Sequence, residues 1–283
     1  MHYGGSVSTS TDAISSGIGI ALEGRHAQDL IGEKAAAECG ALLDRHGVVI
    51  YRQVRVDDDQ LVAFSRLLGQ VLPVPSGAEA THPEVDVISL DPQKSVLAAV
   101  RQGTFLWHLD GTRQQVPEKA TLLTAIEVSD EGGDTEFAST YAAYDALPDA
   151  EKDEIADLRV VHSFTAAQLL ANPNPTDAER AGWDRVPARE HPLVWHRRDG
   201  RRSLLIGATA GEVVGMPADE GRRLLNRLLE FATQPQFVLR HHWQPGDLVI
   251  WDNTGMLHRA IPYEATSRRL MHRTTLVGEE AVA

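Results

Sequence analysis

The sequence predicts a mainly β fold with helices, either an α+β fold or a β-sandwich core decorated with helices. The first observation is that, from residue 237 onward, short apolar runs alternate with turns such as Gln244-Pro245-Gly246. The second is that helical patterns cluster in the first half and between strands. They do not give the regular βαβ alternation of a doubly wound nucleotide-binding fold.

The first 71 residues contain two predicted strands and two predicted helices. Residues 1–16 are rich in Gly, Ser and Thr without hydrophobic periodicity, so we expect a disordered terminus. Short apolar runs predict strands over 17–22 and 47–52. Apolar residues at helical spacing predict helices over 33–46, which Gly47 would end, and over 57–67, which opens on acidic residues.

The rest of the chain alternates long loops with regular elements. Residues 72–104 are rich in Pro, Ser and Gly, and we expect long loops there around one strand over 85–90. The polar segment 168–188, with three prolines, predicts a second long excursion. The other expected elements are a strand over 120–128, helices over 140–145, after Pro148 and from Pro217, and strands over 237–243, 247–252, 256–261 and 270–277.

Composition excludes several classes of protein. Asp and Glu number 40 against 27 Lys and Arg, a formal charge of −13, so we expect no nucleic-acid partner. The single cysteine, Cys39, excludes an internal disulfide and four-thiolate metal sites, and we interpret it as a buried inert thiol. No apolar run reaches about 18 residues, so we expect no membrane span. Because Met1 to Ser6 lack the features of a secretory signal, we expect a cytoplasmic protein.

The pair His108 and Asp110 is the first candidate site. In an extended segment, residues two apart point to the same face, so the imidazole and the carboxylate can aim at one point. With a second histidine they would form the facial triad that suits non-haem Fe(II). Such pairs also arise by chance, and we interpret the similar pair His82 and Glu84, in the proline-rich loop, as structural.

Two C-terminal patterns strengthen that hypothesis. His258 follows Trp251-Asp252-Asn253 near a strand end. In the last strand Arg269 and Arg273 share a face, and His272 lies on the other. If the first face lines the core, two buried guanidiniums need anions, and the nearby sequence offers few, so two anionic ligands are expected. The alternative is an edge strand with solvated arginines.

The third pattern is the turn Gly132-Gly133-Asp134. Its two glycines allow a tight turn, after which Thr135 can aim its hydroxyl inward. By itself this pattern is typical of any turn.

Together these motifs resemble the taurine/2,4-dichlorophenoxyacetate dioxygenase (TauD/TfdA) family. The order His-x-Asp, Gly-Gly-Asp-Thr, Trp-Asp-Asn with a later His, and Arg-Arg-x-x-x-Arg carries the resemblance, which runs from about residue 17 to 278. The second half is most similar to the 2,4-dichlorophenoxyacetate branch, on three stretches: Gly133 to Phe137, Ala142 to Pro148 and Phe237 to Trp243.

The resemblance implies a double-stranded β-helix (jelly roll) core with helical insertions, as one domain over 17–280. It implies an enzyme that couples oxidative decarboxylation of 2-oxoglutarate to hydroxylation of an unactivated C–H bond, using Fe(II) and O₂ and releasing succinate and CO₂. The matching positions are His108, Asp110 and His258 for iron, Thr135 and Arg269 for the distal carboxylate of 2-oxoglutarate, and Arg273 for the anionic substrate. Related halogenating enzymes lack the carboxylate, so Asp110 favours hydroxylation.

Three departures from the family pattern bear on the substrate. Gly111 stands where many relatives carry a hydroxyl-bearing or β-branched residue, and Thr254 stands where an arginine is common. Residues 74–79 lack the histidine and tyrosine of taurine enzymes, which disfavours taurine. We expect a small carboxylate-type anion, with aryloxyalkanoates among the candidates, a lid formed by 72–104, and a homo-oligomer.

Two other classes of protein remain open. The first is a non-catalytic, metal-bearing jelly roll that binds a small acid. The second is a zinc-dependent hydrolase that uses the same three metal ligands. Arg269 and Thr135 discriminate against the hydrolase, because hydrolysis has no use for a clamp on the tail of a keto acid.

Overall fold

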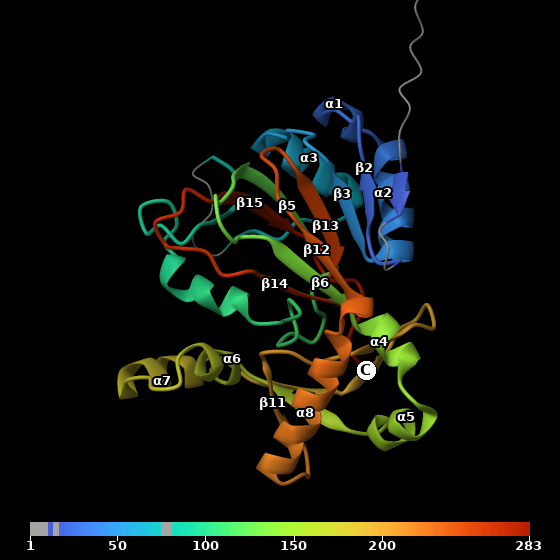
Figure 1. Ribbon diagram of the computed structural model, residues 1–283, viewed down its shortest axis with the longest axis vertical. Helices are drawn as coiled ribbons and strands as arrows, with labels where there is room; N and C mark the ends of the chain where they lie inside the picture. Colours follow the sequence, from blue (N-terminus) through green and yellow to red (C-terminus); the bar gives the residue numbers. More distant parts are fainter. Residues whose placement is uncertain (1–10, 14–16, 75–80) are drawn as a thin grey trace, which may run out of the picture.

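Two sheets form the centre of the computed structural model, which describes residues 11–13, 17–74 and 81–283 (Figure 1). The larger sheet has the strand order β1-β2-β3-β13-β5-β15-β4, and the smaller has the order β12-β6-β14. All neighbours pair antiparallel except β2 and β3. The bounds are β1 (Thr11–Ala13), β2 (Ile20–Leu22), β3 (Val48–Tyr51), β4 (Asp86–Ile88), β5 (Ala120–Glu127), β6 (Thr135–Ser139), β12 (Val238–His241), β13 (Leu248–Asp252), β14 (Met256–Ala260) and β15 (Leu270–Thr275).

Alternating side chains give the larger sheet two apolar faces. On β13, Val249 and Trp251 face one hydrophobic cluster, whereas Leu248 faces another. The first cluster also contains Phe137 and Leu257 of the smaller sheet, and the rings of Phe137 and Trp251 lie 5.4 Å apart. The two sheets therefore pack face to face through this cluster.

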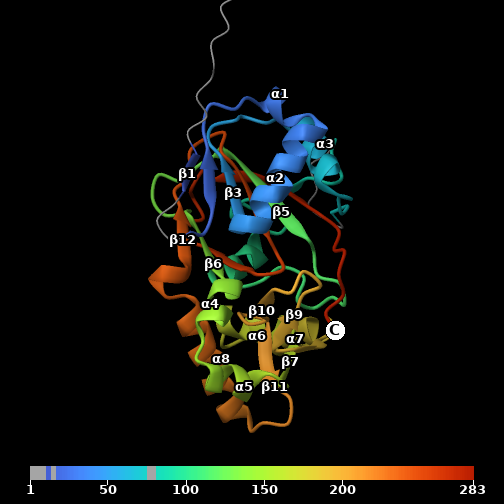
Figure 2. The ribbon, with the colours of Figure 1, turned by 90° about the vertical axis from the view of Figure 1, so that its right-hand side faces the viewer.

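Helices α1 (Ala27–Leu30), α2 (Glu33–His46) and α3 (Asp58–Leu68) cover the outer face of the larger sheet (Figure 2). Asp57 caps α3, since its carboxylate accepts a hydrogen bond from the Gln60 backbone. Gly47 ends α2 in the left-handed region, at φ 71°. Burying Cys39 raises the pKa of its thiol to about 12, so the thiol is inert.

The remaining elements form an insertion at the end of the molecule opposite α1, as both views show. A sheet with the order β11-β7-β8 and the hairpin of β9 and β10 pack there with five helices. The bounds are α4 (Thr140–Ala146), α5 (Asp149–Ile155), β7 (Arg159–His162), α6 (Phe164–Ala171), α7 (Asp177–Asp184), β8 (Arg189–Pro192), β9 (Val194–His196), β10 (Arg202–Leu204), β11 (Ala210–Val213) and α8 (Ala218–Ala232). The short turn η2 (Pro235–Phe237) leads from α8 into β12.

The structure bears out the mainly β fold with helices and the predicted strands of the last region, and it corrects several local expectations. Residues 11–13 form β1 within the segment expected to be disordered, whereas 1–10 and 14–16 lie outside the described residues. The loop region 72–104 ends in a 3₁₀ helix, η1 (Ala98–Phe105), and α6 and α7 occupy much of the excursion expected at 168–188. The sequence analysis did not predict β6, because its alternating polar residues were interpreted as part of the preceding turn. Within the described ranges, no helix combines the length and apolarity needed to cross a membrane.

We predict that Phe64→Ala destabilises the protein by about 3–5 kcal/mol, because it empties a fully buried site between α3 and the sheet. Leu67→Ala, on the same helix, is the matched control; its side chain is 40% exposed, and we expect a loss under about 1 kcal/mol. Urea unfolding followed by circular dichroism measures both values. Equal losses in the two variants would contradict this packing.

Candidate active site

A pair of reciprocal backbone hydrogen bonds joins His108 to His258. The His108 amide donates to the His258 carbonyl at 3.1 Å, and the His258 amide donates to the His108 carbonyl at 2.9 Å. His258 lies in the middle of β14, and His108 follows η1 on an extended segment. This antiparallel bridge brings the two imidazoles side by side, with ring centroids 4.2 Å apart.

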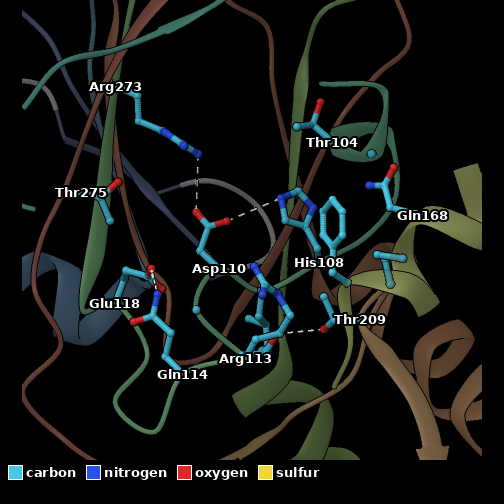
Figure 3. A pocket seen from close by; sticks show the side chains of 17 residues that line it. Thr104, His108, Asp110, Arg113, Gln114, Glu118, Gln168, Thr209, Arg273 and Thr275 are labelled. Atoms are coloured by element: carbon cyan, nitrogen blue, oxygen red, sulfur yellow. Dashed lines mark hydrogen bonds and ion pairs between the residues drawn. The ribbon is translucent and has the colours of Figure 1, made fainter. Parts of the chain in front are cut away.

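Asp110 completes a cluster of three donor groups. Its Oδ1 lies 3.8 Å from Nε2 of His108, and its Oδ2 lies 3.7 Å from Nε2 of His258. Among the described residues these three ligand atoms all lie within 4.8 Å of one another. Figure 3 shows the Asp110 carboxylate pointing toward the ring of His108. The extended segment therefore does aim residues 108 and 110 at one point.

Hydrogen bonds orient these donors for a metal ion. Nδ1 of His108 lies 2.8 Å from the Leu106 carbonyl and donates to it when it carries the proton, which leaves Nε2 as the free ligand atom. The Thr121 hydroxyl donates to Oδ2 of Asp110 at 3.3 Å. Two imidazoles and one carboxylate on one side of a point fit divalent iron and leave other coordination positions open.

The charges of the cluster also fit a metal. Burial alone would raise the pKa of Asp110, but the charges of His258, Arg273 and His108 and the hydrogen bond from Thr121 lower it to about 2. Burial, with the nearby His108, lowers the pKa of His258 to about 3. At neutral pH the site therefore presents an ionised carboxylate and a neutral His258 imidazole, the forms that bind metal.

Arg269 lies in the same cavity as the two histidines and Thr135. It is 3% exposed, and its Nε donates to the Gly133 carbonyl at 3.2 Å. Of the described carboxylates, none lies within ion-pair distance of this guanidinium, whose nearest partners are the Gly133 carbonyl and the ring and hydroxyl of Tyr263. Arg269 is thus a buried cation with room for an anionic ligand.

The predicted Gly-Gly turn has a definite role beside Arg269. Gly133 has φ 75°, and a Cβ at this position would lie 3.0 Å from Cδ of Arg269. The turn therefore lets the arginine pack against its backbone. The Thr135 hydroxyl follows at the start of β6 and accepts a hydrogen bond from Nε1 of Trp243 at 2.9 Å.

Arg273 faces the same cavity as Arg269, as predicted, but it has a carboxylate partner that the sequence did not suggest. Its Nη2 bonds Oδ2 of Asp86 at 2.6 Å, and its Nη1 lies 4.0 Å from Oδ2 of Asp110. Figure 3 shows Asp110 between Arg273 and His108. The expectation of few protein anions nearby was therefore wrong for Arg273. The edge-strand alternative was also wrong, since β15 pairs with β5 on one side and β4 on the other.

Residues away from the site behave largely as expected. His272 faces α3, where its Nδ1 lies 2.6 Å from Asp58. In the pair interpreted as structural, His82 contacts Asp59 and Glu84 contacts Arg66.

A wider opening adjoins the cluster on the side of the insertion. Side chains from the segment after Asp110, from α6 and from the loop before β11 line it, among them Arg113, Gln114, Phe164, Gln168 and Thr209. Figure 3 shows this arrangement around Asp110. Thr104, His108 and Arg273 border both this opening and the cavity that contains Arg269, so the two spaces adjoin at the cluster.

Comparison with known proteins agrees with this geometry. Residues 11–275 match the family model described as taurine catabolism dioxygenase TauD, TfdA family. The chain belongs to the TauD/TfdA family. The resemblance seen in the sequence is thereby confirmed, and TauD/TfdA proteins are dioxygenases.

Relatives and solved structures agree with each other. The α-ketoglutarate-dependent 2,4-dichlorophenoxyacetate dioxygenase of Cupriavidus pinatubonensis is 37% identical over 90% of this chain and 93% of the relative. The (S)-phenoxypropionate/α-ketoglutarate-dioxygenase of Sphingobium herbicidovorans is 32% identical over 83% of this chain and 84% of the relative. The crystal structure of AAD-2 in complex with Mn(II) and N-oxalylglycine is 30% identical, covers 98% of this chain and 100% of its own, and has a TM-score of 0.83.

The structure explains two departures from the TauD/TfdA pattern. A Cβ at Gly111, where φ is 76°, would lie 1.8 Å from Oε2 of Glu118 and 2.7 Å from its backbone nitrogen. At Thr254, where an arginine is common in the family, the guanidinium of Arg197 donates a hydrogen bond to the threonine hydroxyl. The third departure, at residues 74–79, lies outside the described residues from 75 onward.

The sequence prediction missed Arg101, which borders the cavity, and its partner Asp86. Arg101, in η1, pairs with Asp86, in β4, between Nη2 and Oδ1 at 2.5 Å. The available signal was Asp86 itself, since aspartate is depleted in strands and this one interrupts an apolar run. Two tryptophans lie near the histidines: the Trp251 ring lies 4.8 Å from the His258 ring in the cavity, whereas Trp107 stacks on Arg259 and does not line that cavity.

We predict that Gly111→Ser destabilises the protein by about 1–3 kcal/mol and weakens Mn(II) binding, because the new Cβ displaces the backbone next to Asp110. Gly200→Ser is the matched control: its φ is 89°, but nothing lies within 4 Å of its Cβ position. Thermal unfolding and Mn(II) titration measure the two effects. Unchanged Mn(II) affinity in Gly111→Ser would show that the glycine does not support the cluster.

Proposed function

We propose that the chain is an Fe(II)- and 2-oxoglutarate-dependent dioxygenase. It hydroxylates an unactivated C–H bond of a small carboxylate-type anion and releases succinate and CO₂, with aryloxyalkanoates as the first class to test. The observation that supports this most is the shared cavity, in which buried Arg269, without a carboxylate partner among the described residues, lies with His108 and His258. The names of the relatives support the same co-substrate.

Each residue has a distinct role in this proposal. Bound by His108, Asp110 and His258, divalent iron supplies the redox chemistry with O₂. Arg269 and Thr135 bind the distal carboxylate of 2-oxoglutarate, one through a charge-assisted bond and the other through its hydroxyl.

The rest of the site orients and encloses the reactants. Arg273, which borders both the cavity and the wider opening, attracts the anionic end of the prime substrate. Trp251 and Leu123 line the cavity with apolar surface, so they limit the access of water. We propose further that the two packed sheets are a double-stranded β-helix, within a single domain over 17–280.

The hydrolase and the non-catalytic binding protein explain the site less well. A zinc hydrolase gives no role to Arg269, a buried cation whose hydrogen-bond partners in the described structure are the uncharged Gly133 carbonyl and Tyr263 hydroxyl. A binding protein needs no metal cluster with open positions beside that cation.

A panel of aryloxyalkanoates, other carboxylates and sulfonates, scored for stimulated succinate formation, tests the function. We expect formation that requires Fe(II), 2-oxoglutarate and O₂ together, with the largest stimulation by an aryloxyalkanoate. Ester hydrolysis by the Zn(II) form without 2-oxoglutarate would instead support the hydrolase. Acid binding without succinate formation would support the binding protein.

We predict that His258→Ala abolishes both Mn(II) binding and succinate formation, because two ligands cannot hold the facial geometry. His82→Ala is the matched control, since His82 belongs to the other His-x-acid pair and contacts Asp59. Metal titration and succinate assay give the two readouts. Wild-type values in His258→Ala would overturn the proposed metal site.

We predict that Arg269→Ala raises the KM for 2-oxoglutarate about 10- to 100-fold, which corresponds to the loss of a charge-assisted hydrogen bond. The exposed neighbour Arg268 provides the control, Arg268→Ala. Arg273→Ala should instead raise the KM for the prime substrate. Initial-rate kinetics with each substrate varied in turn separate the two, and an unchanged 2-oxoglutarate KM in Arg269→Ala would refute the clamp.

A further inference from the structure

Asp86 holds two guanidiniums side by side. Its Oδ1 bonds Nη2 of Arg101 at 2.5 Å, and its Oδ2 bonds Nη2 of Arg273 at 2.6 Å. The two arginines come from distant segments, η1 and β15. Each guanidinium gives one nitrogen to Asp86 and keeps its remaining donors.

Those remaining donors are not fully used. Arg101 is 7% exposed, and the Nε atoms of both Arg101 and Arg273 are buried without a hydrogen-bond partner. Leaving a buried guanidinium nitrogen unpaired is costly, because it loses its water without replacement. The pair therefore retains hydrogen-bonding capacity that the described residues do not fill.

The charges around the pair do not balance either. Two guanidiniums share Asp86, and the next carboxylate, Asp110, lies 4.0 Å from Arg273 and is committed to the proposed metal site. Asp86 is the carboxylate that acts most strongly on Arg101, and Glu118 acts on Arg273 from farther away. Asp86 alone contacts both guanidiniums and neutralises one of them, so an anionic ligand in the cavity can pair with the other.

Both guanidiniums border the cavity beside the metal cluster. The lining of that cavity includes Arg101, Arg273, Thr104, His108 and His258. Arg101 is fixed there by η1, where the Thr104 hydroxyl donates to the Arg101 carbonyl at 2.6 Å. η1 leads directly into the extended segment that carries His108, so Arg101 and the cluster lie on one continuous segment.

We propose that Arg101 acts with Arg273 as a two-arginine receptor for the anionic head of the prime substrate. The matching head is an oxyanion with at least two oxygens, a carboxylate, sulfonate or sulfate, because it can accept from both guanidiniums at once. Arg101 is then a determinant of specificity for acids over neutral analogues. The inference rests on the proposed function, since it takes Arg269 to be occupied by 2-oxoglutarate.

The test compares an acid with its neutral analogue on the same loaded protein. The protein is loaded with Mn(II) and N-oxalylglycine, and 2,4-dichlorophenoxyacetate or 2,4-dichlorophenoxyacetamide is titrated by calorimetry. In Arg101→Gln we expect the affinity for the acid to fall at least about tenfold and that for the amide to stay unchanged. N-oxalylglycine affinity should also stay unchanged, since Arg101 does not belong to the 2-oxoglutarate clamp.

Two further variants keep the result interpretable. Arg101→Lys keeps the cation and a donor for Asp86, so we expect a smaller loss of acid affinity and a retained preference for the acid. Lys94→Gln is the control, because Lys94 lies in the same loop region and bonds the Arg268 carbonyl away from the cavity.

The outcomes separate this inference from the proposed function. Equal weakening of acid and amide in Arg101→Gln would show a merely structural role and overturn the inference, as would an unchanged acid affinity. If the wild-type protein bound neither N-oxalylglycine nor the acid, the proposed function itself would fail, and the inference with it.

Discussion

The site depends on the reciprocal hydrogen bonds between the backbones of His108 and His258. These two residues are distant in the sequence, yet the bridge brings their rings to 4.2 Å from each other, and Trp251 packs against the ring of His258. Asp110 lies two residues after His108 on the same extended segment, so its carboxylate points to the same side. The smaller sheet supports this arrangement through the pairing of β14 with β6, and β6 in turn places Thr135 at the cavity. The His108–His258 bridge and the pairing of β14 with β6 thus organise the proposed metal site and the proposed co-substrate site together.

The buried arginines determine which ligands the site favours. Arg269 has no carboxylate within ion-pair distance among the described residues, so its guanidinium can pair with an anionic ligand. Arg273 and Arg101, which border the same cavity, share the carboxylate of Asp86. Anions are therefore favoured in this cavity, whereas the net charge of the protein is −13 and gives no long-range attraction for them. The attraction for an anion therefore comes from the nearby guanidiniums, and the low dielectric constant of the buried cavity strengthens it.

Much of this could be predicted from the sequence, where the pattern was local. The i, i+2 spacing of His108 and Asp110 and the shared face of Arg269 and Arg273 follow from strand geometry. The apolar runs likewise predicted the strands after residue 237. The pairing of Asp86 with Arg101 could not be predicted, because it joins η1 to β4 through tertiary contact alone. The insertion was also missed in part, since its strands are only three or four residues long and carry little periodicity.

The visible spectrum of the protein with Fe(II) and 2-oxoglutarate, measured without oxygen, tests the central claim most directly. If His108, Asp110 and His258 hold iron within reach of the Arg269 clamp, adding 2-oxoglutarate should produce a weak visible charge-transfer band that saturates with one equivalent bound. Iron bound with normal affinity but no band at saturating 2-oxoglutarate would contradict the account.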